Sequence, residues 1–317
     1  MQDTLSFLTR RVALLLGTLL AVAILIFAIT RLLPGDVATM ILGMSATKED
    51  LATLREQLGL NQPALVQFTH WLFGIFHGDL GMSTRFQRPI TEVLREPLEK
   101  SAVLCLVGTA FAVPVGVGLG LLSGLKKNSV FDKAVSSLSV FAAAMPEFVT
   151  GGFFIVFFSS WLGWLPAFAS TSGNRSLGQQ AAELIMPVLS LSLVIIAYIL
   201  RMTRASVIDT LESDYIKAAM LKGISRRRLL LHHVLPISMG PTLQVIALSV
   251  GWMASGLVVV ESLFGISGIG RLLVFAIQNR DVPLLQAIAL IVAATYAIAN
   301  LMADLGQRLL DPRVAAR

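Results

Sequence analysis

The stretch DYIKAAMLKGISRRRLLLHHVLP, from Asp214 to Pro236, decides how the fold of this chain is interpreted. It carries five lysine and arginine residues, yet uncharged apolar runs flank it at 184–200 and 234–260. Its first part lacks proline and ends at Gly223, which predicts a short helix from Asp214 to Gly223. A polar helix between two apolar runs indicates a loop at a membrane surface, between two spanning helices.

The composition of the chain is that of a membrane protein. Of its 317 residues, 55% are hydrophobic and only 14% are charged, whereas a soluble domain has about 25% charged residues. The formal net charge is +6, but the basic residues lie beside the apolar runs, where they orient the chain in the bilayer. We therefore expect the lipid bilayer, and not nucleic acid, as the partner of these charges.

Six segments are apolar over the roughly 20 residues that a spanning helix needs. They are residues 12–30, 101–125, 134–165, 184–200, 234–260 and 282–303. The whole chain, 1–317, is thus predicted to be one all-α transmembrane domain with six spanning helices. In the second segment Gly116, Gly120 and Gly124 recur every four residues, a spacing that predicts close approach of another helix.

The basic residues of the short loops predict the orientation of the chain. Seven lysine and arginine residues lie between 201 and 228, and others flank both ends of the chain. Because such residues favour the cytoplasmic side, both termini and the loop 201–233 are expected in the cytoplasm and the loop 31–100 outside. Within that outer loop, SATKEDLATLREQLGL predicts a short helix, capped by Ser45 or Thr47 and ended by Gly59.

The sequence offers no chemistry of its own for catalysis. It lacks the G-x-x-x-x-G-K-[ST] phosphate-binding loop, its four histidines are scattered, and no serine stands in a recognisable nucleophile motif. We therefore predict that the chain is not an enzyme, that it binds no metal ion and that it holds no cofactor.

A carboxylate inside a predicted span is the main candidate for contact with a solute. Glu147 follows Pro146, and counting from Ala134 places it roughly 20 Å into a core about 30 Å thick. Such an acid normally faces a cavity or a partner, so it either lines a solute path, pairs within the bundle, or reaches the outer interface where Pro146 breaks the helix. Gln244 is a second polar candidate, with hydrogen bonding between helices as its alternative role.

The opening stretch resembles the loop motif E-A-A-x3-G-x9-I-x-L-P of ABC-importer permeases. The matching positions are Lys217, Ala218, Ala219, Gly223, His233, Leu235 and Pro236. Lys217 replaces the glutamate and His233 the isoleucine, although a basic residue is common at the first position in the dipeptide/oligopeptide/nickel subfamily. The segments QLGLNQP, GDLGMS, RMTRAS and LLDPR also resemble that subfamily, so the similarity covers the whole length of the chain.

The resemblance implies an ABC-importer permease in the inner membrane of a bacterium. Asp214 to Gly223, including Tyr215, would form a coupling helix in a cleft of a cytoplasmic ATPase. Two such ATPases would bind the ATP and magnesium that this chain does not. A second, homologous permease would supply the other half of the translocation path, and an extracytoplasmic solute-binding protein would dock on the outer loop and the turn 262–283.

The resemblance leaves the solute open. Peptides, either dipeptides or oligopeptides, are the expected cargo, and nickel or another small solute is the alternative for the same machinery. A self-contained channel or secondary transporter is the alternative from another class, but it would require an inverted repeat or intramembrane ion sites. The sequence shows no repeat and one clearly placed intramembrane acid.

Overall fold

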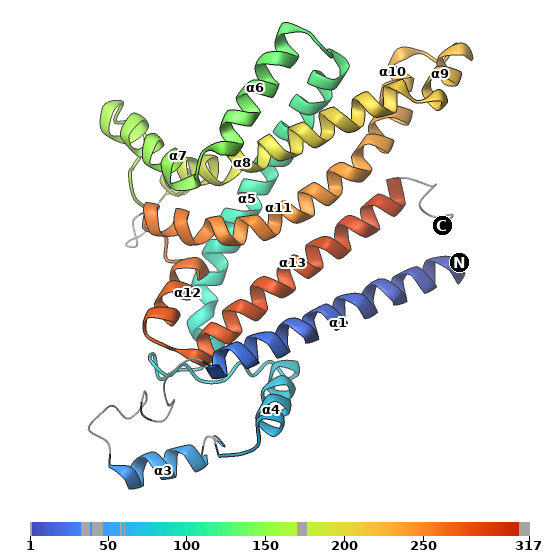
Figure 1. Cartoon of the computed structure of the whole chain (residues 1–317). Helices are drawn as coiled ribbons and strands as arrows, with labels where there is room; N and C mark the ends of the chain where they lie inside the picture. The colour runs from blue at the N-terminus through green and yellow to red at the C-terminus, as the bar shows by residue number, and fades with distance from the viewer. Residues whose placement is uncertain are drawn as a thin grey trace.

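The predicted all-α membrane fold is confirmed. The computed structural model describes residues 2–32, 39, 47–57, 59, 61–169 and 176–310, and over this part of the chain it contains helices and no named strand. A single isolated bridge joins Met82 to Pro89. Long helices form most of the molecule and lie roughly alongside one another (Figure 1).

Five helices are long and apolar enough to cross a membrane. They are α1 (Gln2–Leu32), α5 (Ile90–Leu125), α8 (Leu177–Glu212), α11 (Leu235–Phe264) and α13 (Val282–Leu310). Each exceeds the apolar segment that the sequence indicated; α5 begins eleven residues before residue 101 and α8 continues twelve residues past residue 200. The reason is that hydropathy marks the stretch in contact with lipid, whereas a helix continues into water with charged side chains.

The remaining apolar segment is divided by a sharp bend. α6 (Val130–Ala144) and α7 (Glu147–Phe154), which continues as a π-helix over Ile155–Trp161, meet at an angle of 104°. The sequence predicted one span over 134–165, with Pro146 able to break it, and the break occurs at Met145 and Pro146. Pro146 has no N–H for the helix and disfavours helical geometry in the residue before it. The pair counts as a sixth span if the bent helices cross together.

α8 is the central helix of the bundle and packs against α5, α6, α7 and α11. The predicted close approach at the three glycines of α5 is confirmed, with α8 as the partner. A Cβ atom on Gly116 would lie 2.8 Å from Cγ2 of Ile199, and one on Gly124 would lie 2.8 Å from Cγ1 of Val207. Larger residues at these positions would therefore push the two helices apart.

Two short helices precede α5. In α3 (Lys48–Gln57), the backbone N–H of Asp50 donates to Oγ1 of Thr47 at 3.1 Å, so Thr47 caps the helix. Gly59 follows with a φ of +63°, as expected for the residue after a helix, while Ser45 lies outside the described residues. The next helix, α4 (Ala64–Phe76), packs against α1.

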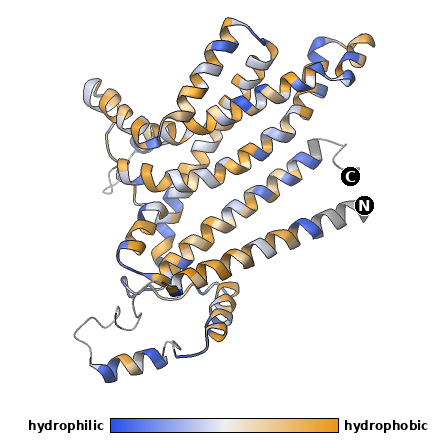
Figure 2. Ribbon diagram, in the orientation of Figure 1, coloured by the Kyte–Doolittle hydropathy of each residue, from blue (hydrophilic) through white to orange (hydrophobic). Residues whose placement is uncertain are grey.

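The short helices lie at two opposite ends of the bundle (Figure 1). One end, here called the α9 end, holds α9 (Asp214–Leu221), α10 (Arg226–Leu229), the start of α1 and the end of α13. The other, here called the α12 end, holds α3, α4 and α12 (Ile269–Gln278). Hydrophobic residues dominate the long helices between these ends, and hydrophilic residues gather at α3 and around α9 and α10 (Figure 2).

Candidate functional site

The helix α9 is anchored to the rest of the chain by one apolar face. Ile216 is fully buried and Ala219 is 6% exposed, and both belong to a cluster with Val207 of α8, Leu229 of α10 and Val234. Ala219, one of the positions of the loop motif, is thus packed within this chain, where a larger group would displace α9 from α8.

The sides of α9 that do not pack on this cluster are exposed. Leu221 is 90% exposed, Met220 50% and Tyr215 40%, and Ala218 is exposed as well. Lys217 pairs with Asp214 at 3.0 Å on this exposed side. An apolar surface flanked by charges, on a helix held rigidly from behind, is the arrangement that fits into a groove of a partner protein.

The two ends of the predicted motif are fixed by local geometry. Gly223 has a φ of +74°, the left-handed conformation that glycine commonly adopts just after a helix. The Tyr215 hydroxyl and Nδ1 of His233 lie 2.6 Å apart, so the histidine that departs from the family pattern bonds back to α9. Leu235 and Pro236 begin α11, which continues without a break from a π-helical turn over Leu230–Val234.

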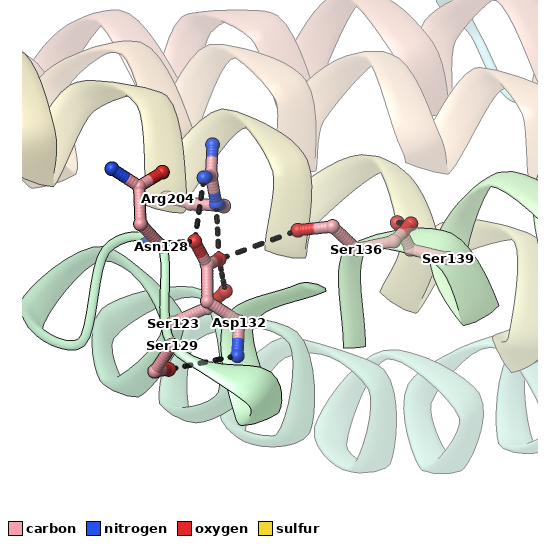
Figure 3. Close-up of polar contacts among 7 residues, drawn as sticks. All are labelled: Ser123, Asn128, Ser129, Asp132, Ser136, Ser139 and Arg204. Atoms are coloured by element: carbon pink, nitrogen blue, oxygen red, sulfur yellow. Dashed lines mark hydrogen bonds and ion pairs between the residues drawn. The ribbon is translucent and has the colours of Figure 1, made fainter. Parts of the chain in front are cut away.

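A buried ion pair lies behind this motif and was not anticipated from the sequence. Arg204 of α8 binds Asp132 of α6 through two contacts, Nε to Oδ1 at 2.5 Å and Nη2 to Oδ2 at 2.8 Å (Figure 3). The Ser123 hydroxyl of α5 donates to the same carboxylate, as does the backbone N–H of Asn128 at 2.9 Å. With the Asp132 side chain 2% exposed, the pair locks α5, α6 and α8 together at the α9 end.

Further polar contacts join this group to α11. Oγ1 of Thr203 on α8 lies 3.2 Å from Oγ1 of Thr242 on α11, and both residues are fully buried. Closer to α9, the Ser238 hydroxyl of α11 lies 3.3 Å from Oγ1 of Thr210 on α8. Hydrogen bonds between buried side chains resist sliding of helices past each other, so α8 and α11 hold a fixed register beside α9.

Glu147, the predicted intramembrane acid, opens α7 directly after the bend. It is half-buried, and a Cβ atom on Gly256 of α11 would lie 3.7 Å from its Oε1. Among the described residues no hydrogen bond or ion pair to its carboxylate is found, although its backbone oxygen accepts from Thr150 at 2.9 Å. Of the three predicted roles, pairing within the bundle therefore finds no support among the described residues.

Gln244 lies elsewhere in the bundle. Its Nε2 donates to Oε1 of Gln307 at 2.9 Å, which joins α11 to α13. Twelve residues of α11 separate it from Gly256, beside which Glu147 lies, so the two candidates differ in depth by about 18 Å. The structure thus does not bring Pro146, Glu147 and Gln244 into one cluster.

Two buried carboxylates organise the α12 end, and sequence reasoning missed both. Asp281, fully buried, accepts from the Ser83 hydroxyl and from the backbone N–H groups of Thr84 and Arg85, both at 3.2 Å. This joins the GDLGMS segment to the start of α13. Ser83 lies in the GDLGMS segment of the family resemblance, but a separation of 198 residues from Asp281 conceals the contact in the sequence.

The second carboxylate is that of Glu261, also fully buried. It accepts from the Ser101 hydroxyl of α5 at 2.5 Å and from the backbone N–H of Arg271 at 3.0 Å. The Ser101 oxygen in turn accepts from the N–H of Ile269 at 2.8 Å. A negative group at the start of α12 satisfies its free N–H groups and favours the helix dipole, so Glu261 fixes α12 across α5 and α11.

Two family models and several known proteins are similar to this chain. Residues 116–316 match the family model of the binding-protein-dependent transport system inner membrane component, and residues 4–90 match the N-terminal model of such components. A probable peptide ABC transporter permease protein of Sinorhizobium fredii is 37% identical over 97% of this chain and 98% of its own length. A putative peptide transport system permease protein of Brucella abortus is 34% identical over 98% of both chains. A glutathione transport system permease protein of Salmonella choleraesuis is 33% identical over 98% of this chain and 99% of its own.

Proposed function

The chain belongs to the family of binding-protein-dependent transport system inner-membrane components, the permeases of ABC importers, and on this premise we propose that it forms half of an import path for dipeptides or oligopeptides. It is a multi-pass membrane protein and a transport subunit rather than an ATPase. A second, homologous permease supplies the other half of the path. Two cytoplasmic ATPases bind ATP and magnesium, and an extracytoplasmic solute-binding protein delivers the peptide.

The observation that carries the proposal is the two-faced helix α9. Its inner face, Ile216 and Ala219, is packed within the chain, while Met220 is 50% and Leu221 90% exposed. A helix seated in an ATPase groove through the outer face moves with the ATPase, and its inner face passes that movement to α8. The sites of ATP hydrolysis and solute movement are thereby linked mechanically.

Beyond α9, the movement has a continuous route toward the bend. Arg204 of α8 holds Asp132, which lies in the first turn of α6, and α6 ends at the break before Glu147. A rigid helix shifted at one end displaces the other end as well, so α6 carries the displacement to the carboxylate. Glu147 then has different surroundings in each state of the transport cycle, as alternating access to a solute site requires.

The chemistry of Glu147 favours a solute with a cationic group. A carboxylate at membrane depth that has no partner among the described residues attracts a positive charge, which offsets its own loss of hydration. Peptides carry such a charge on the free amino terminus, and the permeases to which this chain is similar bear peptide or glutathione transport in their names. A peptide whose amino group passes Glu147 therefore accounts for both observations.

The orientation follows from the same proposal. The α9 end must face the cytoplasm, where the ATPases are, and the α12 end must face outward. Cysteines at Ser225, between α9 and α10, and at Thr47, before α3, would test this in intact cells after Cys105 is replaced by serine. An impermeant maleimide should label position 47 alone, and labelling of position 225 from outside would reverse the topology.

A matched pair of substitutions tests the role of α9. Leu221→Glu places a charge on its outer face, and Val130→Glu does the same at an equally exposed position, 85%, of the α9 end. Only Leu221→Glu should reduce co-purification of the ATPases and transport-stimulated hydrolysis, with insertion of both variants intact. If both substitutions have equal effects, or if neither has an effect, α9 is not the coupling element.

The solute is best identified on the binding protein. Thermal-shift measurements on the binding protein encoded beside the permease should show stabilisation by dipeptides or oligopeptides, because a ligand that binds the native state raises its melting temperature. Glutathione and nickel chelates are the comparison set. Stabilisation by nickel chelates alone would exclude the peptide proposal while leaving the permease function in place.

A further inference from the structure

The helix α4 (Ala64–Phe76) is apolar on two faces, only one of which packs against the chain. Its sequence, ALVQFTHWLFGIF, contains no acidic, lysine or arginine side chain. Thirteen residues at about 1.5 Å each give a length near 20 Å, which is too short to cross a hydrocarbon core of about 30 Å. α4 is therefore not a seventh span, yet it is too apolar for an ordinary loop helix in water.

The packed face of α4 meets α1 through aromatic rings. Phe68 and Trp71 lie with their ring centroids 5.3 Å and 5.9 Å from that of Phe27. The guanidinium carbon of Arg31, one turn further along α1, lies 5.4 Å from the centroid of the same Phe27 ring. Aromatic rings with an arginine beside them are typical of the boundary between hydrocarbon and lipid headgroups.

The other face of α4 carries three large, mostly exposed apolar side chains, of which Phe73 packs on the ring of His77, the residue after the helix, with centroids 4.2 Å apart. Leu65 is 73% exposed, Phe73 66% and Phe76 75%. At 100° per residue these three lie within about 80° of one another, whereas Gln67 and His70 lie together on a different arc of the helix. The only polar side chain among the apolar three, Thr69, returns its hydroxyl to the oxygen of Val66 at 2.9 Å.

The position of α4 along α1 gives its depth. Phe27 precedes the last residue of α1, Leu32, by five residues, which places the aromatic contact about 7.5 Å inside the end of the helix. Helices that lie in a membrane interface are buried by about 5–10 Å. At this level α1 itself exposes Leu25 and Ile29, at 57% and 52%, so the apolar surface of α1 continues onto α4.

We propose that α4 lies in the bilayer interface at the α12 end and inserts Leu65, Phe73 and Phe76 among the lipid acyl chains. Gln67 and His70 then face the headgroups and water. Lipid is the occupant that these observations favour, because Leu65, Phe73 and Phe76 offer no charge or hydroxyl to a protein partner and continue the apolar surface of a spanning helix. The role of α4 is to anchor the segment between α1 and α5 at the membrane surface, and the inference holds whichever side that end faces.

Spin-label accessibility tests the proposal without any transport assay. Single cysteines would replace Leu65, Phe73, Phe76 and His70 in a Cys105→Ser background, and the labelled importer would be studied in lipid nanodiscs. At positions 65, 73 and 76 collisions with oxygen, which concentrates in lipid, should exceed those with a water-soluble nickel complex several-fold. Position 70 should show the reverse ratio.

Two results would overturn the proposal. If positions 65, 73 and 76 are as accessible to the nickel complex as position 70, the face lies in water. If these three are protected from both reagents, a protein surface covers α4, and repeating the measurement with and without the binding protein would show whether that protein is the cover. Gel filtration of each labelled variant as an intact importer would establish that the labelled protein is folded.

Discussion

Arg204 of α8 holds Asp132 of α6 with both ends of its guanidinium group, at 2.5 Å and 2.8 Å, and α5 adds the Ser123 hydroxyl to the same carboxylate. Asp132 is nearly fully buried, while the arginine side chain retains 29% exposure. The carboxylate is shielded from water, and these donors replace the hydrogen bonds of its hydration shell. Removing one partner is therefore expected to destabilise the protein more than removing both.

We predict that Arg204→Gln destabilises the protein by about 3 kcal/mol, because it leaves a buried carboxylate without its cation. The double variant Asp132→Asn, Arg204→Gln should recover part of this loss. Lys127→Gln is the control, since its pair with Glu212 at the same end is exposed on both sides, at 46% and 64%, and such pairs contribute about 0–1 kcal/mol. Melting of the detergent-solubilised protein measures all three, and equal melting temperatures for the two single variants would contradict the prediction.

A second prediction concerns Gly268, which lies against the Glu261 carboxylate. A Cβ atom there would overlap both Oε1 of Glu261 and Oγ of Ser101, so Gly268→Ala must displace the groups that bind the start of α12. We expect a loss of about 1–3 kcal/mol, typical of overpacking. Gly118→Ala on α5 is the control, because nothing lies within 4 Å of its Cβ position, and it should be neutral or stabilise by about 0.5–1 kcal/mol. Thermal melting that ranks the two variants in the opposite order would show that α12 is not held in this way.

A third prediction tests the proposed contact of Glu147 with the solute. Glu147→Gln should lower uptake of a dipeptide with a free amino terminus about tenfold or more, because a hydrogen bond to a charged group contributes about 1.5–3 kcal/mol. Uptake of the same peptide with an acetylated amino terminus should change little, so the variant loses the discrimination that wild type shows. Transport into proteoliposomes measures both, with Glu147→Asp as the variant that keeps the charge. If Glu147→Gln slows both peptides equally, the residue has a structural role only.

The sequence was sufficient for the features that a short stretch of chain determines. Lipid imposes long apolar runs, so the spanning helices could be located, and the glycines of α5 and Gly223 could be placed because each needs only its own spacing or backbone angle. The contact of Asp132 with Arg204 joins residues 72 apart, and that of Ser83 with Asp281 residues 198 apart. Nothing in the sequence distinguishes these four residues from the charged and polar residues of ordinary loops, and only the packing of the helices brings the members of each pair together. The bend at Pro146 lies between these cases, since the proline indicated a break but not its angle of 104°.

The last prediction concerns the turn that ends α9. Gly223 has a φ of +74°, and nothing lies within 4 Å of the position of its missing Cβ. The Cβ atom of Gly223→Val therefore meets no clash, and we expect a cost of about 1–2 kcal/mol from the left-handed backbone. Because the strain lies at the end of α9, it should loosen α9 while the spanning helices stay folded.

Gly223→Asn supplies the matched control, because asparagine tolerates the left-handed conformation better than a β-branched residue. We expect Gly223→Val to insert normally but to lower the amount of solute moved per ATP hydrolysed, and Gly223→Asn to remain close to wild type. The measurement is uptake and hydrolysis on the same proteoliposomes. If the valine variant moves as much solute per ATP as the asparagine variant, the end of α9 does not need a defined backbone, and the coupling movement must pass through another part of the chain.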